Sequence, residues 1–84
     1  MPYINQKIRG ELDVLIKPLV DICRHLMWGE LNYVLTKILL GCRPETYADY
    51  NGLVGVLECV KLELYRRMVA PFEDSKKKEN GEVY

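Results

Sequence analysis

The stretch from Thr46 to Val69 reads TYADYNGLVGVLECVKLELYRRMV and is the longest run with a helical period, so the expected fold class follows from it. Thr46 with Asp49 three residues later resembles a capping box, which satisfies free backbone N–H groups where a helix begins. Apolar side chains then recur every three or four positions, as on one face of a helix. They are Tyr50, Leu53, Leu57, Val60, Leu64 and Met68. We therefore predict a helix from about Tyr47 to Val69, which Pro71 ends.

Small side chains form a second row on this helix, at spacings of four, three and four. They are Ala48, Gly52, Gly55 and Cys59. Glycine inside a helix costs about 0.5–1 kcal/mol relative to alanine, so we expect these positions to permit close approach of another helix backbone. Glu58 with Lys61 and Glu63 with Arg67 have the spacing of surface ion pairs, each worth roughly a few tenths of a kcal/mol.

A broad apolar stripe runs along the first part of the chain at helical spacing. It consists of Ile8, Leu12, Leu15, Leu19, Ile22 and Leu26, with Ile16, Val20, Cys23 and Met27 beside them. Pro18 interrupts the stripe and removes one backbone donor, which predicts a kink or break. We expect a short helix from about Gln6 and a second piece from about Lys17 to Met27.

The segment from about Glu30 to Leu40 predicts a third helix. It is apolar on more than one face, which indicates burial by the rest of the fold or by another subunit. Gly41 stands where a left-handed residue would cap its C-terminus. The expected fold is all-α: a small three-helix bundle with a kinked N-terminal segment. We predict one helical domain over residues 1–72 and a charged C-terminal tail over residues 73–84.

Length and charge restrict the functions that the chain can perform. Its 84 residues carry 12 basic and 12 acidic side chains, so the net charge is zero and a dedicated nucleic-acid binder is not expected. A core this small gives little stability, which favours association with copies of the same chain. No apolar run is long enough to span a bilayer, and no signal segment is evident at the start. We expect a cytoplasmic protein that does not bind membranes.

Few residues offer catalytic chemistry. The spacing of the three cysteines, Cys23, Cys42 and Cys59, is not that of a zinc site. We predict reduced thiols, two of them facing the core. The chain has one histidine, and its one serine, Ser75, lies in the charged tail, so a hydrolytic triad is not expected. Glu58 and Glu63 are five positions apart, which does not suit a magnesium-dependent hydrolase. We expect no enzyme, no metal and no cofactor.

One polar cluster remains as a candidate site. It joins Glu30, Asn32 and Tyr33, at the start of the third predicted helix, with Arg66 and Arg67. Arginine forks beside aromatic rings suit a small nucleotide pocket, and the same residue types are enriched at protein interfaces. We favour the interface over the ligand pocket.

Most of the chain from Gly29 onward resembles a family of short helical proteins from phage and bacterial genomes. The matching segments are GELNY (29–33), GVLECVKLELYRR (55–67), VAPFED (69–74) and ENGEVY (79–84). The resemblance implies a small helical protein of phage or bacterial type, in the cytoplasm of the bacterial host cell, and transfers no catalytic residue.

We predict a non-enzymatic, homo-oligomeric protein-interaction module. As an alternative, the chain is similar in size and charge to phage proteins that sequester nucleotide-derived immune signals between subunits. Replacing both arginines would then abolish ligand binding without unfolding the helices. The expected partners are copies of itself and either a protein or a small nucleotide.

Overall fold

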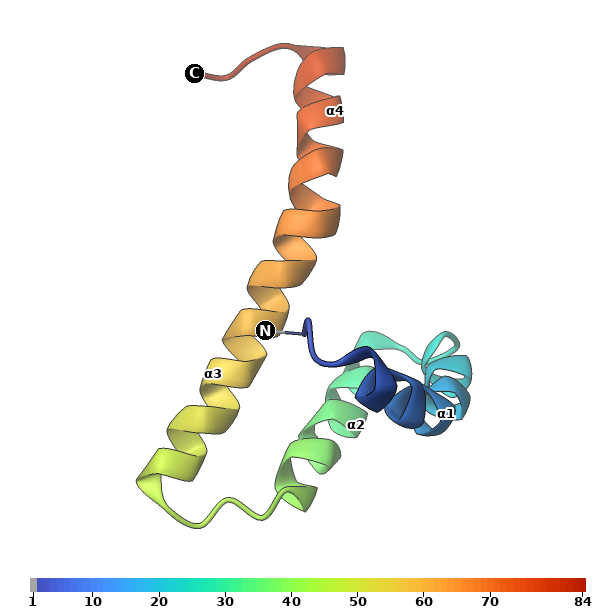
Figure 1. The fold of residues 1–84 in the computed structure, drawn as a ribbon. Coiled ribbons are helices and arrows are strands. Elements are labelled where there is room, and N and C mark those ends of the chain that lie inside the picture. Colours follow the sequence, from blue (N-terminus) through green and yellow to red (C-terminus); the bar gives the residue numbers. More distant parts are fainter. Residues whose placement is uncertain (1) are drawn as a thin grey trace.

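The computed structural model describes residues 2–84, and all regular structure in this part of the chain is helical. The elements are α1 (Gln6–Cys23), α2 (Trp28–Gly41), α3 (Tyr47–Leu64), the π-helix η1 (Tyr65–Val69) and α4 (Ala70–Asn80). Figure 1 shows that α3, η1 and α4 follow one another as a single long rod, with α1 and α2 to one side of it. The prediction of an all-α protein is confirmed.

Helix α1 begins at Gln6 and is capped by Asn5, whose side chain accepts a hydrogen bond from the N–H of Lys7 at 2.9 Å. It then continues to Cys23 with Pro18 inside it. The predicted division into two pieces, the second reaching Met27, is therefore not observed. Proline removes a single hydrogen-bond donor, and the apolar stripe keeps the same period on both sides of it, so the helix continues.

Helix α2 begins two residues earlier than predicted, because Oε1 of Glu30 accepts a hydrogen bond from the N–H of Met27 at 2.8 Å. At the other end, Gly41 is the last helical residue and does not adopt the left-handed conformation. That conformation occurs at Arg43, with a φ of 54°. The prediction for Gly41 was wrong because the N–H of Cys42 bonds back to the last turn and continues the right-handed winding.

The capping box predicted for α3 is confirmed. The N–H of Asp49 donates to Oγ1 of Thr46 at 3.2 Å, and Oδ2 of Asp49 accepts from the N–H groups of Glu45 and Thr46, each at 3.1 Å. These hydrogen bonds, those from the two backbone groups first, lower the pKa of Asp49 below its ordinary value of 3.8. The local sequence alone therefore determines where α3 begins.

Pro71 does not end the long helix, contrary to the prediction. An α-helix would press its ring against the carbonyl of Arg67 and would lack one N–H donor. The chain winds more widely just before this position: in η1 the N–H of Ala70 donates to the carbonyl of Tyr65, five residues back. The rod therefore passes Pro71 as α4, which ends at Asn80. The division into a domain and a tail at residue 73 stays a prediction.

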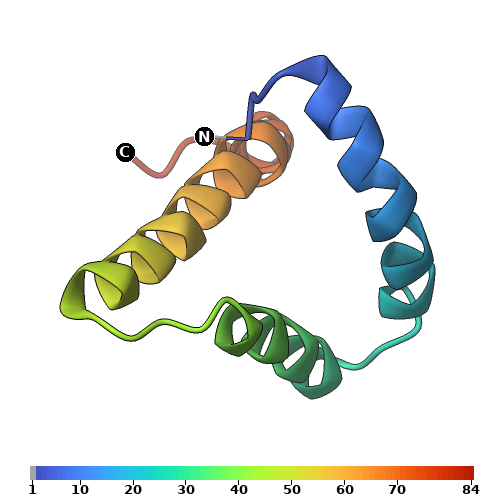
Figure 2. The same ribbon diagram turned by 60° about the horizontal axis from the view of Figure 1, so that its bottom comes forward.

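The helices form an open arrangement instead of the predicted three-helix bundle. In Figure 2, α1, α2 and α3 lie along three sides of a frame, and the N-terminal arm (residues 2–5) closes it against the rod. No residue between 2 and 84 is buried. The partly sheltered apolar residues include Leu26 in the α1–α2 connection, Leu31 in the first turn of α2, and Leu53 near the start of α3. Neighbouring helices are joined by short loops, and their apolar rows do not interdigitate.

The overall dimensions also show that the chain is less compact than an ordinary domain of its length. The Cα radius of gyration is 16.5 Å, against about 12 Å for a compact domain of this length. The accessible surface is 7951 Å², roughly 2,800 Å² more than a folded monomer of 9.8 kDa exposes. Among the described residues, no helix has the length and apolar character needed to cross a membrane.

Candidate functional site

The structure places the five predicted site residues in two separate regions. Glu30 and Tyr33 line a shallow hollow at the start of α2 with Leu26, Gly29 and Val34. Arg67 lines a different groove on the long rod. The single polar cluster expected from the sequence is therefore not assembled within one chain.

The polar side chains at the start of α2 are used locally. The carboxylate of Glu30 caps the helix at Met27. The hydroxyl of Thr36 donates to the backbone carbonyl of Asn32 at 2.8 Å and to its Oδ1 at 3.3 Å. Tyr33 remains 65% exposed, so it is the one predicted residue here whose ring is open to a partner.

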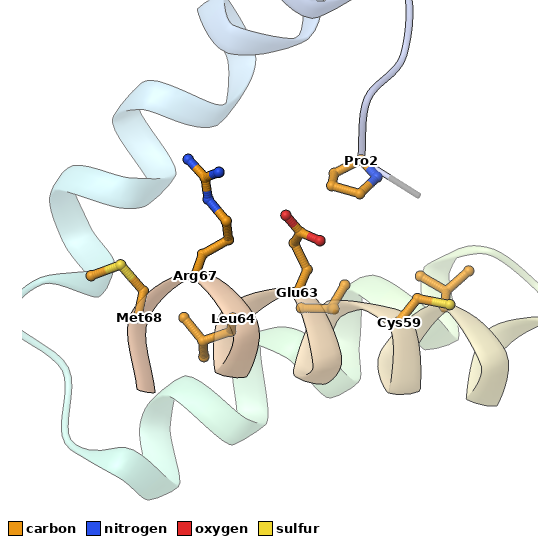
Figure 3. A pocket seen from close by; sticks show the side chains of 8 residues that line it. Pro2, Cys59, Glu63, Leu64, Arg67 and Met68 are labelled. Carbon is orange, nitrogen blue, oxygen red and sulfur yellow. The ribbon is translucent and has the colours of Figure 1, made fainter. Parts of the chain in front are cut away.

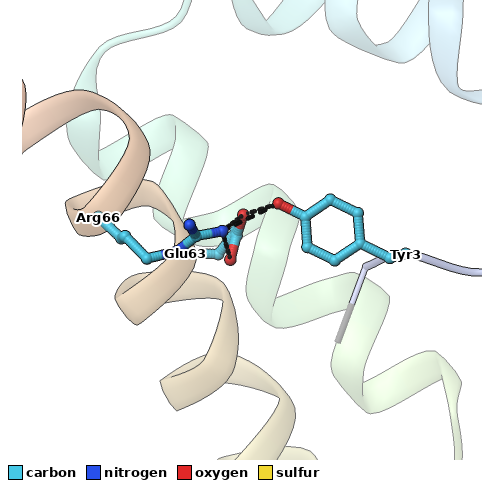
Figure 4. Close-up of polar contacts among 3 residues, drawn as sticks. All are labelled: Tyr3, Glu63 and Arg66. Carbon is cyan, nitrogen blue, oxygen red and sulfur yellow. Dashed lines mark hydrogen bonds and ion pairs between the residues drawn. The ribbon is translucent and has the colours of Figure 1, made fainter.

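A cluster that the sequence did not predict joins the N-terminal arm to the rod. Tyr3 donates its hydroxyl hydrogen to Oε1 of Glu63, and Nη2 of Arg66 donates to Oε1 and Oε2 of Glu63 at 2.8 and 3.1 Å. The same Nη2 lies 3.1 Å from the Tyr3 hydroxyl, and Figure 4 shows all three side chains converging. We call this cluster the clasp. The clasp joins Tyr3 to Glu63, 60 positions later, and to Arg66, 63 positions later. No local sequence pattern predicts such a contact.

The clasp has a clear electrostatic effect. The hydrogen bond from Tyr3, and then the hydrogen bond and charge of Arg66, lower the pKa of Glu63 below its ordinary value of 4.5. In return, the Glu63 carboxylate raises the pKa of Arg66. The expected Glu63–Arg67 ion pair is therefore replaced by a Glu63–Arg66 pair, whereas the predicted Glu58–Lys61 pair forms at 2.9 Å.

An apolar groove lies beside the clasp on the surface of α3 and η1, with a volume of about 520 Å³. It is lined by Pro2, Val56, Cys59, Val60, Glu63, Leu64, Arg67 and Met68. In Figure 3 the Glu63 and Arg67 side chains stand side by side toward the N-terminal arm, and Pro2 approaches from that arm. Among residues 2–84, Glu63 pairs with Arg66, and no ion pair involves Arg67. The groove therefore has mostly apolar walls and two charged side chains, and the charge of Arg67 helps to lower the pKa of Glu63 although the two do not form an ion pair.

The small residues predicted to pack against a helix face open space. A Cβ added at Gly52 or Gly55 would meet no atom within 4 Å outside the neighbouring backbone of its own helix. The role of Ala48, Gly52, Gly55 and Cys59 in helix packing stays a prediction, and within the described chain no helix approaches the two glycines.

The thiols are more accessible than expected. Cys42 and Cys59 are exposed and Cys23 is partly exposed, so the prediction of two core-facing thiols was wrong because the described chain has no buried core. No group of three or more potential metal ligands among histidine, cysteine and acidic side chains occurs in the part that the structure describes.

A family described as a domain of unknown function (DUF6899) matches residues 1–83. No curated protein matches the chain. No solved structure matches it either.

Proposed function

The chain belongs to the DUF6899 family, a domain of unknown function, and we propose that it is a non-enzymatic homo-oligomeric protein-interaction module. One observation carries the proposal: no residue between 2 and 84 is buried although 49% of the sequence is hydrophobic. An amphipathic helix that faces water on its apolar side has lost the main source of its stability in a folded protein.

The size of the exposed surface supports association over a merely loose monomer. The largest apolar patch on a typical soluble monomer covers about 300–600 Å². Here the total accessible surface, polar and apolar together, exceeds that of a compact monomer by roughly 2,800 Å², and many large apolar side chains contribute to it. If two copies each covered that surplus, they would bury about 5,600 Å² in total, which is the size of an obligate interface. Zero net charge means that copies do not repel one another over long distances.

The polar end of the rod supports a role beyond self-association. Figure 1 shows α4 projecting from the frame, and its side chains from Glu73 onward are almost all charged or polar. Such a helix has little apolar surface to contribute to an oligomer core, so it stays accessible on the assembly. The proposed contact with another protein would use this accessible end or the exposed surface around Tyr33.

Native mass spectrometry with sedimentation equilibrium of the full chain tests the proposal. We expect a single oligomeric species at micromolar concentration and helical circular dichroism that persists only where that species is present. A folded monomer under these conditions would refute the proposal.

The same mass measurement tests the alternative of a sequestered nucleotide, which would add bound mass to the oligomer. The geometry supports that alternative less. A phosphate bound to Arg66 would have to displace the Glu63 carboxylate that already pairs with it. We therefore keep the protein-interaction module as the proposed function.

A further inference from the structure

We propose that the groove on α3 and η1 receives helix α1 of a second copy, and that the second copy's groove receives α1 of the first. This inference rests on the proposed homo-oligomer and specifies its contact. A reciprocal exchange uses the same two surfaces twice, so it closes as a two-fold symmetric dimer and leaves no open end for further growth.

Helix α1 has the surface that such a groove requires. Its apolar stripe consists of Ile8, Leu12, Leu15, Ile16, Leu19, Val20 and Ile22, all between 36% and 72% exposed in the single chain. Lys17 and Asp21 lie on the opposite side of the helix, as the helical period dictates. An amphipathic helix that lays one apolar face into an apolar groove is a recurrent mode of recognition between proteins.

The two surfaces match in length. At a rise of about 1.5 Å per residue, the groove from Val56 to Met68 extends about 18 Å along the rod and the stripe from Ile8 to Ile22 about 21 Å. The chain's own α1 does not occupy the groove. Figure 2 shows α1 leading away from the rod once the N-terminal arm ends, so the groove meets only Pro2 of that arm.

The charges are complementary as well. Arg67 stands in the groove, and no ion pair involves it among the residues that the structure describes. Glu11 and Asp13 border the two edges of the α1 stripe, and in the same part of the chain no ion pair involves them either. A helix seated in the groove would bring one of these carboxylates toward the Arg67 guanidinium. Because both lie in the N-terminal half of α1, this pairing would favour the direction that places that half beside Arg67.

A second copy fits better than an unrelated protein because of the area available. The stripe and the groove belong to the same chain, and both are exposed within residues 2–84. The surplus surface of the whole chain, roughly 2,800 Å², exceeds what a standard interface needs on each side, about 800 Å². Covering only one of the two surfaces with a foreign protein would leave the other apolar surface in water.

Two valines on α3 provide a matched test. Val60 lines the groove, whereas Val54 does not, and their exposed fractions in the single chain are similar, 59% and 65%. Val60→Asp and Val54→Asp introduce the same charge into the same helix. We expect sedimentation to show at least a tenfold weaker dimer for Val60→Asp and an unchanged dimer for Val54→Asp. Equal effects of the two substitutions, or no effect of either, would overturn the α1–groove contact.

Disulfide cross-linking identifies the occupant even if Val60→Asp fails to fold. Cys59 lies in the groove, so a chain with Cys23→Ala and Cys42→Ala keeps one thiol there. To this chain Ile16→Cys adds a thiol on the stripe, and Lys17→Cys adds one on the opposite face as the control. A mixture of isotopically labelled and unlabelled chains distinguishes bonds between copies from bonds within one.

On mild oxidation, we expect peptides of mixed isotopic composition that join position 16 to Cys59, and far fewer such peptides for the Lys17→Cys control. A disulfide requires Cα atoms within about 7 Å, so the bond reports direct apposition. A dimer without this cross-link, or with equal cross-linking from both positions, would overturn the inference and leave the proposed homo-oligomer standing. A folded monomer would overturn both.

Discussion

Dilution should destabilise this protein, because its helices lack a core until copies associate. For a dimer that unfolds to two free chains, each tenfold dilution lowers the free energy of unfolding by about 1.4 kcal/mol at room temperature. The unfolding entropy of two chains of 84 residues is about 350 cal/mol/K, taken from the average entropy change per residue. The melting temperature should therefore fall by about 4 °C for every tenfold dilution.

The assay is thermal unfolding followed by circular dichroism at several protein concentrations that span two decades. Over that range the melting temperature should fall by about 8 °C. The Val60→Asp variant serves as the control: where it is monomeric, any remaining transition should not depend on concentration. A wild-type melting temperature that stays constant across the range would refute the reasoning, because it would mean that a single chain supplies its own stability.

Three further perturbations test local features. Thr46→Ala should lower the free energy of unfolding by about 1 kcal/mol because the cap of α3 loses its hydrogen-bond acceptor. The control Thr36→Ala, within α2, should change this free energy by less than about 0.5 kcal/mol. Urea unfolding measures both variants, and equal losses of stability would contradict the capping role of Thr46. Acidification should weaken the fold: Asp49 and Glu63 have pKa values lowered in the folded state, so their stabilisation is present above the ordinary values of 3.8 and 4.5 and disappears as the pH falls through the lower folded values. Urea midpoints measured against pH should show this loss, and Asp49→Asn should make the loss smaller. If the urea midpoint of Asp49→Asn fell with acid as steeply as that of the unchanged protein, Asp49 would not contribute to the pH dependence. Pro71→Ala should raise the free energy of unfolding, by at most about 3 kcal/mol, because the restored N–H permits ordinary α-helical bonding through η1; a lower urea midpoint would show that the π-helix is needed.

The candidate site was only partly predictable. The sequence drew attention to Arg66, Arg67 and Tyr33 because of their residue types, and all three are accessible in the structure. It did not reveal that Tyr3 would bind Glu63 and Arg66, since partners 60 and more positions apart meet only through the path of the whole chain. The expected three-helix bundle would have covered the apolar face of α1, and no helical period indicates which surface covers that face instead.

The existence of the helices, though not all of their ends, could be predicted from the sequence. Their periods, the capping box of α3 and the helix content all follow from contacts between residues at most four or five positions apart, which the sequence displays directly. The open arrangement of the helices and the clasp that closes the frame became evident only from the three-dimensional structure. The wider π-turn before Pro71 is a local feature that the helical period did not reveal. The clasp depends on the path of the whole chain, and the openness depends on how apolar faces are shared between elements. A pattern of apolar residues requires that a face be buried, but it does not specify whether the same chain or a second copy buries it.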